Sequence, residues 1–131
     1  MAKLILSAYS RDCQRPSHMI KLTEHGDEPL ARGTIFRCMK AKWPYENRVD
    51  YLLCDLSDGL GLIVCSGYNA GLVYRILPHD AYAPNTGMLS PKWIRDHWMK
   101  WGYSDCPLDD VYIGEIASME LIGPRQGNIQ E

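Results

Sequence analysis

Four histidines and five cysteines could hold a metal ion, because imidazole nitrogens and thiolates are the usual protein ligands of zinc. Zinc sites have short ligand spacings, such as a pair of cysteines separated by only a few residues. No pair of cysteines or histidines in this chain has such a spacing, and Cys13, His18 and His25 lie in a loose polar stretch. The sequence therefore predicts no metal site and no cofactor.

Cys106 and His97 could act as a nucleophile and its base, since a reactive thiolate needs a base or a cation within hydrogen-bond reach. Asp105 precedes Cys106, however, and a neighbouring carboxylate disfavours the thiolate. The alternative is a structural cysteine packed under a sheet, which is the more common state of a free cysteine. We therefore expect no catalytic residues, and a small Cys–His enzyme is the least favoured function.

Cations and aromatic rings alternate along one stretch of the first half, in the mixture with which proteins bind single-stranded nucleic acid. The rings and cations of this stretch are Arg37, Lys40, Lys42, Trp43, Tyr45 and Arg48. The alternative is a solvated edge strand whose lysines prevent pairing with other strands. The net charge of −2 favours the edge strand, because a general nucleic-acid binder needs a basic excess. A small single-stranded RNA-binding protein stays an alternative function.

Tryptophans followed by an acidic loop are the most distinctive feature of the second half. Trp98 and Trp101 share a helical face with Ile94 and are expected in the core, whereas Trp93 is off this face and is expected at an edge or on the surface. Aromatic anchors beside carboxylates are typical of tight interfaces with a basic protein partner. The residues that we predict to contact such a partner are Tyr68, Trp93, Asp105, Asp109 and Asp110.

The composition is that of a globular protein, with 131 residues, 46% hydrophobic and 23% charged. We expect one domain over residues 1–131, in which 1–32 have little pattern and 124–131 form a frayed tail. No apolar run is long enough to span a bilayer. The apolar stretch among the first residues is also too short for a signal peptide. Five cysteines without a C-x-x-C pair favour free thiols. We therefore expect a cytoplasmic protein without a membrane partner.

Strand patterns fill most of the chain. Two turn sequences, Ser57-Asp58-Gly59 and Gly67 to Gly71, join the central strands into an antiparallel meander. The predicted strands are residues 3–8, 19–23, 34–41, 49–56, 60–66, 72–77 and 111–122.

One helix is predicted over residues 90–101. Ser90 can cap its first turn, and Pro91 suits the first helical position. Gly102 follows the last periodic residue and is expected as a left-handed C-cap. The fold class is thus α+β, an antiparallel sheet of four to six strands with one Trp-rich helix packed on it.

Six motifs follow one another along the middle and the second half of the chain. They are Arg48-Val49-Asp50-Tyr51-Leu52-Leu53, Gly61-Leu62-Ile63-Val64, Ser66-Gly67-Tyr68-x-Ala70-Gly71-Leu72, Trp93-x4-Trp98-x2-Trp101, Tyr103-x-Asp105-Cys106-Pro107 and Asp110-Val111-Tyr112. Their order and spacing resemble the bacterial immunity proteins of the family known as immunity protein forty-five, over about residues 33–114. Such proteins are encoded beside polymorphic toxins of contact-dependent inhibition and related secretion systems. The resemblance implies a non-catalytic inhibitor with no shared catalytic residues.

The leading hypothesis is therefore an immunity protein that binds the C-terminal toxin domain of its own system in the cytoplasm. The resemblance implies that it blocks the active site or the substrate surface of the toxin, by stoichiometric occlusion. Many toxins of these systems are nucleases, including enzymes that cleave transfer RNA, and an acidic loop suits their basic clefts. The net charge of −2 is mild for a nuclease inhibitor. No direct nucleic-acid partner is expected.

Overall fold

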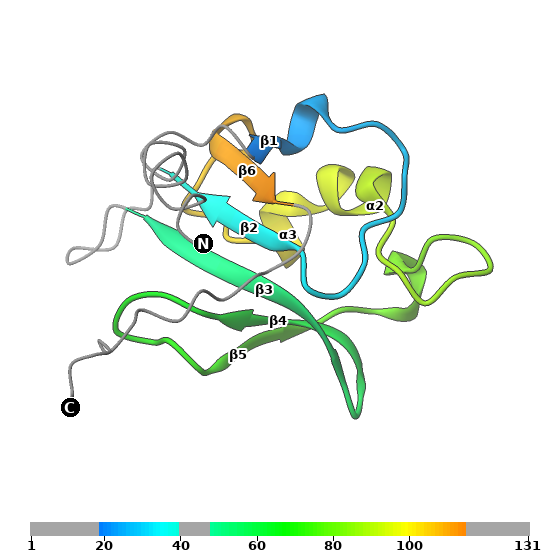
Figure 1. The fold of residues 1–131 in the computed structure, drawn as a ribbon, viewed down its shortest axis with the longest axis horizontal. Helices are drawn as coiled ribbons and strands as arrows, with labels where there is room; N and C mark the ends of the chain where they lie inside the picture. The colour runs from blue at the N-terminus through cyan, green and yellow to red at the C-terminus, as the bar shows by residue number, and fades with distance from the viewer. Residues whose placement is uncertain (1–18, 40–47, 115–131) are drawn as a thin grey trace, which may run out of the picture.

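The computed structural model describes residues 19–39 and 48–114 (Figure 1). The predicted strand at 3–8 and the predicted tail at 124–131 lie outside these residues, and the single domain over 1–131 stays a prediction. The described strands are β1 (Met19–Lys21), β2 (Ile35–Cys38), β3 (Val49–Leu56), β4 (Gly59–Val64), β5 (Val73–Ile76) and β6 (Val111–Gly114). The helices are α2 (Pro91–Asp96), α3 (Trp98–Trp101) and three 3-10 turns, η1 (Leu22–Glu24), η2 (His79–Ala81) and η3 (Leu108–Asp110).

The six strands form one antiparallel sheet in the order β1-β6-β2-β3-β4-β5. Strands β2 to β5 are the predicted meander, and β4 lies inside the sheet, as its two apolar faces indicated. The late strand β6 inserts between β1 and β2. This part of the sheet is therefore held together by pairing between strands that are distant in the sequence. The structure confirms the α+β class and gives six strands, the upper end of the predicted range.

Several strand bounds differ from the prediction. The strand predicted at 19–23 ends at Lys21, because the chain turns in η1 and buries Leu22. The strand predicted at 34–41 ends at Cys38, before residues 40 and 41, which lie outside the described part. The strand at 49–56 has the predicted bounds, and the described part of the last strand is Val111–Gly114.

The predicted helix is present but broken into α2 and α3 at His97. Its start is as predicted, because Ser90 Oγ accepts a hydrogen bond from the Trp93 amide at 3.2 Å and Pro91 occupies the first turn. At His97 the backbone leaves the helical region (φ −117°, ψ 16°). The His97 ring also reaches back, with Nδ1 2.7 Å from the Trp93 carbonyl oxygen, the acceptor of the His97 amide. A side chain that shares a backbone acceptor competes with the regular helix at this point.

Trp98 fixes the helices to the sheet. Its side chain is buried, its ring lies 6.2 Å from the Phe36 ring on β2, and its Nε1 donates to the Cys106 carbonyl oxygen at 2.9 Å. Ile94 is also buried, as predicted, whereas Trp101 is only half-buried. Burying an indole of this size contributes about 3–5 kcal/mol to stability, judged from truncations to alanine.

Gly102 corrects a prediction. Its backbone is extended (φ −96°, ψ −156°), so it is not a left-handed cap. A glycine is needed for another reason, since a Cβ at this position would overlap the ring of Trp98. The chain leaves α3 directly over the indole, and only a residue without a side chain allows that close approach.

Gly102→Ala is therefore expected to destabilise the fold by about 1–3 kcal/mol, the usual cost of overpacking a core. Urea unfolding followed by tryptophan fluorescence measures this free energy. Gly87→Ala is the matched control, since nothing lies within 4 Å of a Cβ built there. Equal midpoints for the two variants would show that the approach to Trp98 is not tight.

Candidate functional site

Two loops meet at one end of the sheet, drawn at the left of Figure 1. Cys38, which ends β2, pairs with Val49, the first residue of β3, and with Val111, the first residue of β6. β4 ends beside the start of β3. Segments 65–72 and 102–110 therefore lie at the same end, which we call the loop end.

Four of the five predicted contact residues lie at the loop end. Tyr68 is 86% exposed on the β4–β5 loop. Asp105 and Asp109 are exposed, and Asp110 is half-buried, on the segment that leads into β6. Trp93 is not among them, because it lies on α2, away from the β4–β5 loop (Figure 1). Its half-buried ring stacks on His97 at 4.3 Å between centroids. The contact role of all five residues stays a prediction.

The β4–β5 loop is held by its own backbone. Gly67 and Gly71 have φ of 77° and 96°, values that favour glycine. The Gly71 amide donates to the Val64 carbonyl at 2.6 Å, and the Val64 amide donates to the Leu72 carbonyl at 2.9 Å. Tyr68 is thus carried on a closed, hydrogen-bonded turn, and its exposed ring is not the end of a loose loop.

Segment 102–110 is anchored at its start, its middle and its end. The Gly102 carbonyl accepts from the Tyr74 hydroxyl at 3.2 Å, and the Cys106 carbonyl accepts from the Trp98 indole. At the end, the Met39 amide donates to the Asp110 carbonyl at 3.1 Å, and the Asp110 amide donates to the Pro107 carbonyl at 2.9 Å in η3. The carboxylates of Asp105 and Asp109 are therefore presented from a fixed backbone.

A pocket of about 190 Å³ opens between the two loops. We call it the tyrosine pocket, and its lining residues are Val49, Tyr51, Val64, Asn69, Tyr74, Tyr103 and Asp105. Asn69 belongs to the β4–β5 loop, beside Tyr68, and Asp105 belongs to the other loop. The pocket therefore joins the two groups of predicted contact residues. No pattern in the sequence indicates this pocket, because its rings come from three distant segments.

Cys106 lies in the core as a free, buried cysteine. It is fully buried, and its Sγ donates weakly to the carbonyl oxygens of Pro107 and Asp110 at 3.6 and 3.7 Å. Burial raises the pKa of the Cys38 thiol far above its usual range, and the neighbouring Cys106 raises it further. His97 is exposed on the helix break, where its Nδ1 faces a backbone carbonyl. The full burial of Cys106 favours the structural alternative, since reactive cysteines are partially exposed.

The predicted RNA-binding stretch is only partly described. Arg37 makes a bidentate ion pair with Asp50, in which Nε and one terminal nitrogen each lie 3.0 Å from a carboxylate oxygen. Arg48 Nε lies 3.8 Å from the same carboxylate, which is nearly buried. Both arginines are thus engaged by a carboxylate of the chain itself, which weakens the RNA-binding alternative. The other four residues of the stretch, 40, 42, 43 and 45, lie outside the described part.

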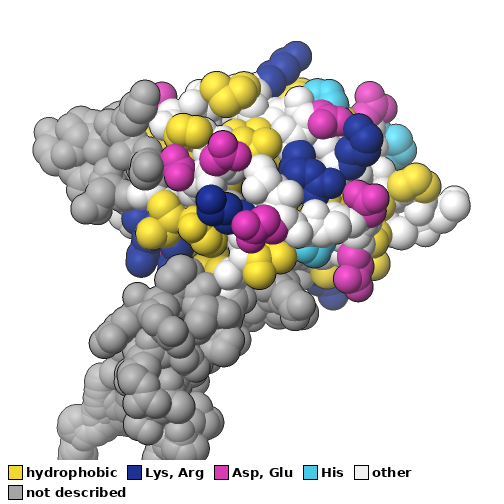
Figure 2. All heavy atoms as spheres, turned by 90° about the horizontal axis from the view of Figure 1, so that it is seen from above, with side chains coloured by type: hydrophobic (Ala, Val, Ile, Leu, Met, Phe, Trp, Pro, Cys, Tyr) yellow, Lys and Arg dark blue, Asp and Glu magenta, His cyan; other side chains and the backbone are white. Residues whose placement is uncertain are grey.

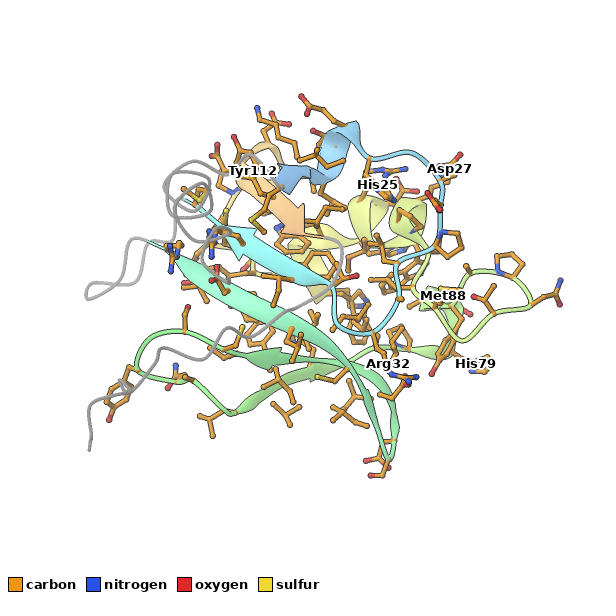
Figure 3. The ribbon with its side chains drawn as sticks, in the orientation of Figure 1. His25, Asp27, Arg32, His79, Met88 and Tyr112 are labelled. Carbon is orange, nitrogen blue, oxygen red and sulfur yellow. The ribbon has the colours of Figure 1, made fainter. Side chains whose placement is uncertain are left out.

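The opposite side of the domain carries a wider pocket of about 530 Å³. Arg32 and Asp55 line it and form an exposed ion pair at 3.1 Å. Arg32 and Met88 lie on the same side as His79, away from the loop end (Figure 3). The face seen in Figure 2 mixes hydrophobic, acidic and basic side chains without a field of one sign. Neither surface singles out a ligand.

Two further findings concern the described residues alone. Within them, no group of three or more histidine, cysteine or acidic residues is arranged to hold a metal ion. None of the helices in residues 19–39 and 48–114 has the length and apolar content needed to cross a bilayer.

A family model described as Immunity protein 45 matches residues 22–113 of the chain. The chain belongs to this family. The match includes both loops of the loop end, and it begins at η1, earlier than the predicted start at residue 33. Comparisons with curated proteins and with solved structures found no match.

The reactivity of the buried thiols tests whether Cys106 has a structural role. Cys65 is exposed, whereas Cys38 and Cys106 are buried. In the native protein at pH 8, we expect iodoacetamide to alkylate Cys65 and to leave Cys38 and Cys106 unmodified until urea is added, as read by peptide mass spectrometry. Native alkylation of Cys106 as fast as that of Cys65 would contradict a structural role.

Proposed function

We propose that this member of the Immunity protein 45 family neutralises a cognate toxin by binding its toxin domain in a stoichiometric complex. The family match over residues 22–113 carries the proposal. The complex would form in the cytoplasm and cover the active site or the substrate surface of the toxin. The inhibitor needs no catalytic residue of its own for this task, which agrees with the buried state of Cys106.

We place the contact surface at the loop end. The support is the concentration of exposed Tyr68, Asp105 and Asp109 on two hydrogen-bonded loops. Leu72 and Val73 extend the same surface with apolar side chains that are 59% and 53% exposed. Exposed apolar side chains next to carboxylates are the composition of an interface with an apolar centre and a charged rim.

The carboxylates favour a toxin with a basic contact surface. In the described residues, no cation forms an ion pair with Asp105 or Asp109, so both charges remain for a partner. Nucleases carry basic clefts for their substrates, and we therefore propose a nuclease toxin, with transfer RNA as one substrate. Opposite charges steer the two proteins together and raise the association rate above the neutral range of ~10⁵–10⁶ M⁻¹s⁻¹.

The first test uses the toxin domain encoded by the neighbouring gene. We expect its expression in a bacterial host to arrest growth, and co-expression of this chain to restore growth. Asp109→Lys is expected to raise the Kd of the complex at least about tenfold, or about 1.4 kcal/mol, because it puts a like charge against a basic surface. Calorimetry of the purified pair measures this change.

Asp58→Lys is the matched control. Asp58 is also exposed, but it lies in the β3–β4 turn at the opposite end of the sheet. Neither variant is expected to change the thermal midpoint. A toxin that this chain fails to neutralise would refute the function, whereas equal affinities of the two variants would only remove Asp109 from the interface.

A further inference from the structure

We propose that the tyrosine pocket receives one lysine or arginine side chain of the toxin, which anchors the complex. This inference rests on the proposed function and names the chemistry of its central contact. The pocket lies between the two loops of the loop end, so a side chain that enters it is surrounded by the predicted contact surface.

Three tyrosine rings line the pocket and contact one another. The Tyr51 ring lies 4.9 Å from Tyr74 and 5.8 Å from Tyr103 between centroids, and the Tyr74 and Tyr103 rings meet edge to face at 6.4 Å. The Tyr74 hydroxyl donates to the Gly102 carbonyl at 3.2 Å, which ties β5 to the segment that carries Asp105. Such a fixed set of rings can bind a cation through their negative faces.

The chain itself shows that one of these rings accepts a cation. The pairing of β4 with β5 shifts register at a bulge, so that Tyr74 is an extra residue between Val73 and Arg75. The Arg75 guanidinium carbon lies 5.0 Å from the centre of the Tyr74 ring. Arg75 is not among the lining residues, so its charge borders the pocket without filling it.

The charge of Asp105 favours a positively charged side chain in the pocket. Asp105 is the charged residue among those that line the pocket, and Asn69 lines it from the other loop. A carboxylate in the lining repels an acidic side chain and attracts an ammonium or guanidinium group. Arg75 lowers this attraction but leaves Asp105 without an ion pair in the described residues.

The size and the walls select a long side chain. A volume of about 190 Å³ is below the ~300–1,000 Å³ of pockets for small molecules and cofactors. Val49 and Val64 supply apolar wall for the methylene stem of a lysine or arginine, while its charged head reaches the carboxylate. Burial raises the pKa of Tyr51, so its phenol stays neutral and adds no competing charge.

The test separates the pocket from general charge attraction. Asp105→Asn keeps the shape and removes the charge, and we expect the Kd for the toxin domain to rise at least about tenfold, mainly through faster dissociation. Asp109→Asn, at the same end but outside the pocket, is expected to slow association and to leave dissociation nearly unchanged. Asp58→Asn, at the opposite end, should change neither rate. Surface plasmon resonance measures both rate constants.

Tyr103→Phe and Tyr103→Ala test the ring. We expect Phe to preserve affinity within about threefold and Ala to weaken it at least about tenfold, with folding checked by circular dichroism. Asp105→Asn is a surface change, so it keeps the test decisive even if Tyr103→Ala fails to fold.

A probe without the toxin completes the design. Ethylguanidinium, which mimics the arginine head, should shift the amide resonances of residues 103–105 and 69, and the neutral analogue ethylurea should not. If the wild-type chain neutralises the toxin and Asp105→Asn has unchanged association and dissociation rate constants, the proposed role of the pocket is wrong and the proposed function still holds. Failure of the wild-type chain to bind the toxin domain would overturn the function itself.

Discussion

The burial of Trp98 is the interaction on which the rest of the structure depends. Its ring packs on Phe36 of the sheet, and its indole nitrogen binds the carbonyl of Cys106 on the following segment. One side chain therefore links α3 to strand β2 and to the middle of segment 102–110. Gly102 has no side chain because the backbone must pass directly over that ring.

This anchoring gives the loop end the rigidity that the proposed contact with the toxin requires. The two loops are closed by backbone hydrogen bonds and by the bond from Tyr74 to Gly102. Little conformational entropy is then lost when a partner binds, and less of the interaction free energy is consumed in ordering the loops. The proposed function requires slow dissociation from the toxin, and the fixed aromatic rings and the carboxylate that line the tyrosine pocket suit that requirement.

The local features of the fold could be predicted from the sequence, because nearby residues decide them. The bounds of β3 follow from alternation, and the start of α2 follows from Ser90 and Pro91. The break at His97 and the conformation of Gly102 could not be predicted, although their contacts are local. Hydrophobic periodicity does not show that the His97 ring shares the Trp93 carbonyl, or that the Trp98 ring lies against Gly102. The insertion of β6 between β1 and β2 could not be predicted either, because it joins strands that are far apart in the sequence.

The site was predicted in part for the same reason. Exposed Tyr68 and the acidic segment stand out by residue type, and the register of the sheet brings them to one end. Trp93 was grouped with these residues because of its neighbours in sequence, whereas the structure places it on α2, and its contact role stays a prediction. The tyrosine pocket depends on a bulge in β5, which neither alternation nor spacing reveals.

Amide hydrogen exchange of the complex with the toxin domain tests the central claim most directly. The account predicts that exchange slows on binding in segments 65–72 and 102–110, and that residues 84–89 on the opposite side keep their rates. Protection confined to residues 84–89 or to η1, with both loops of the loop end unchanged, would contradict it.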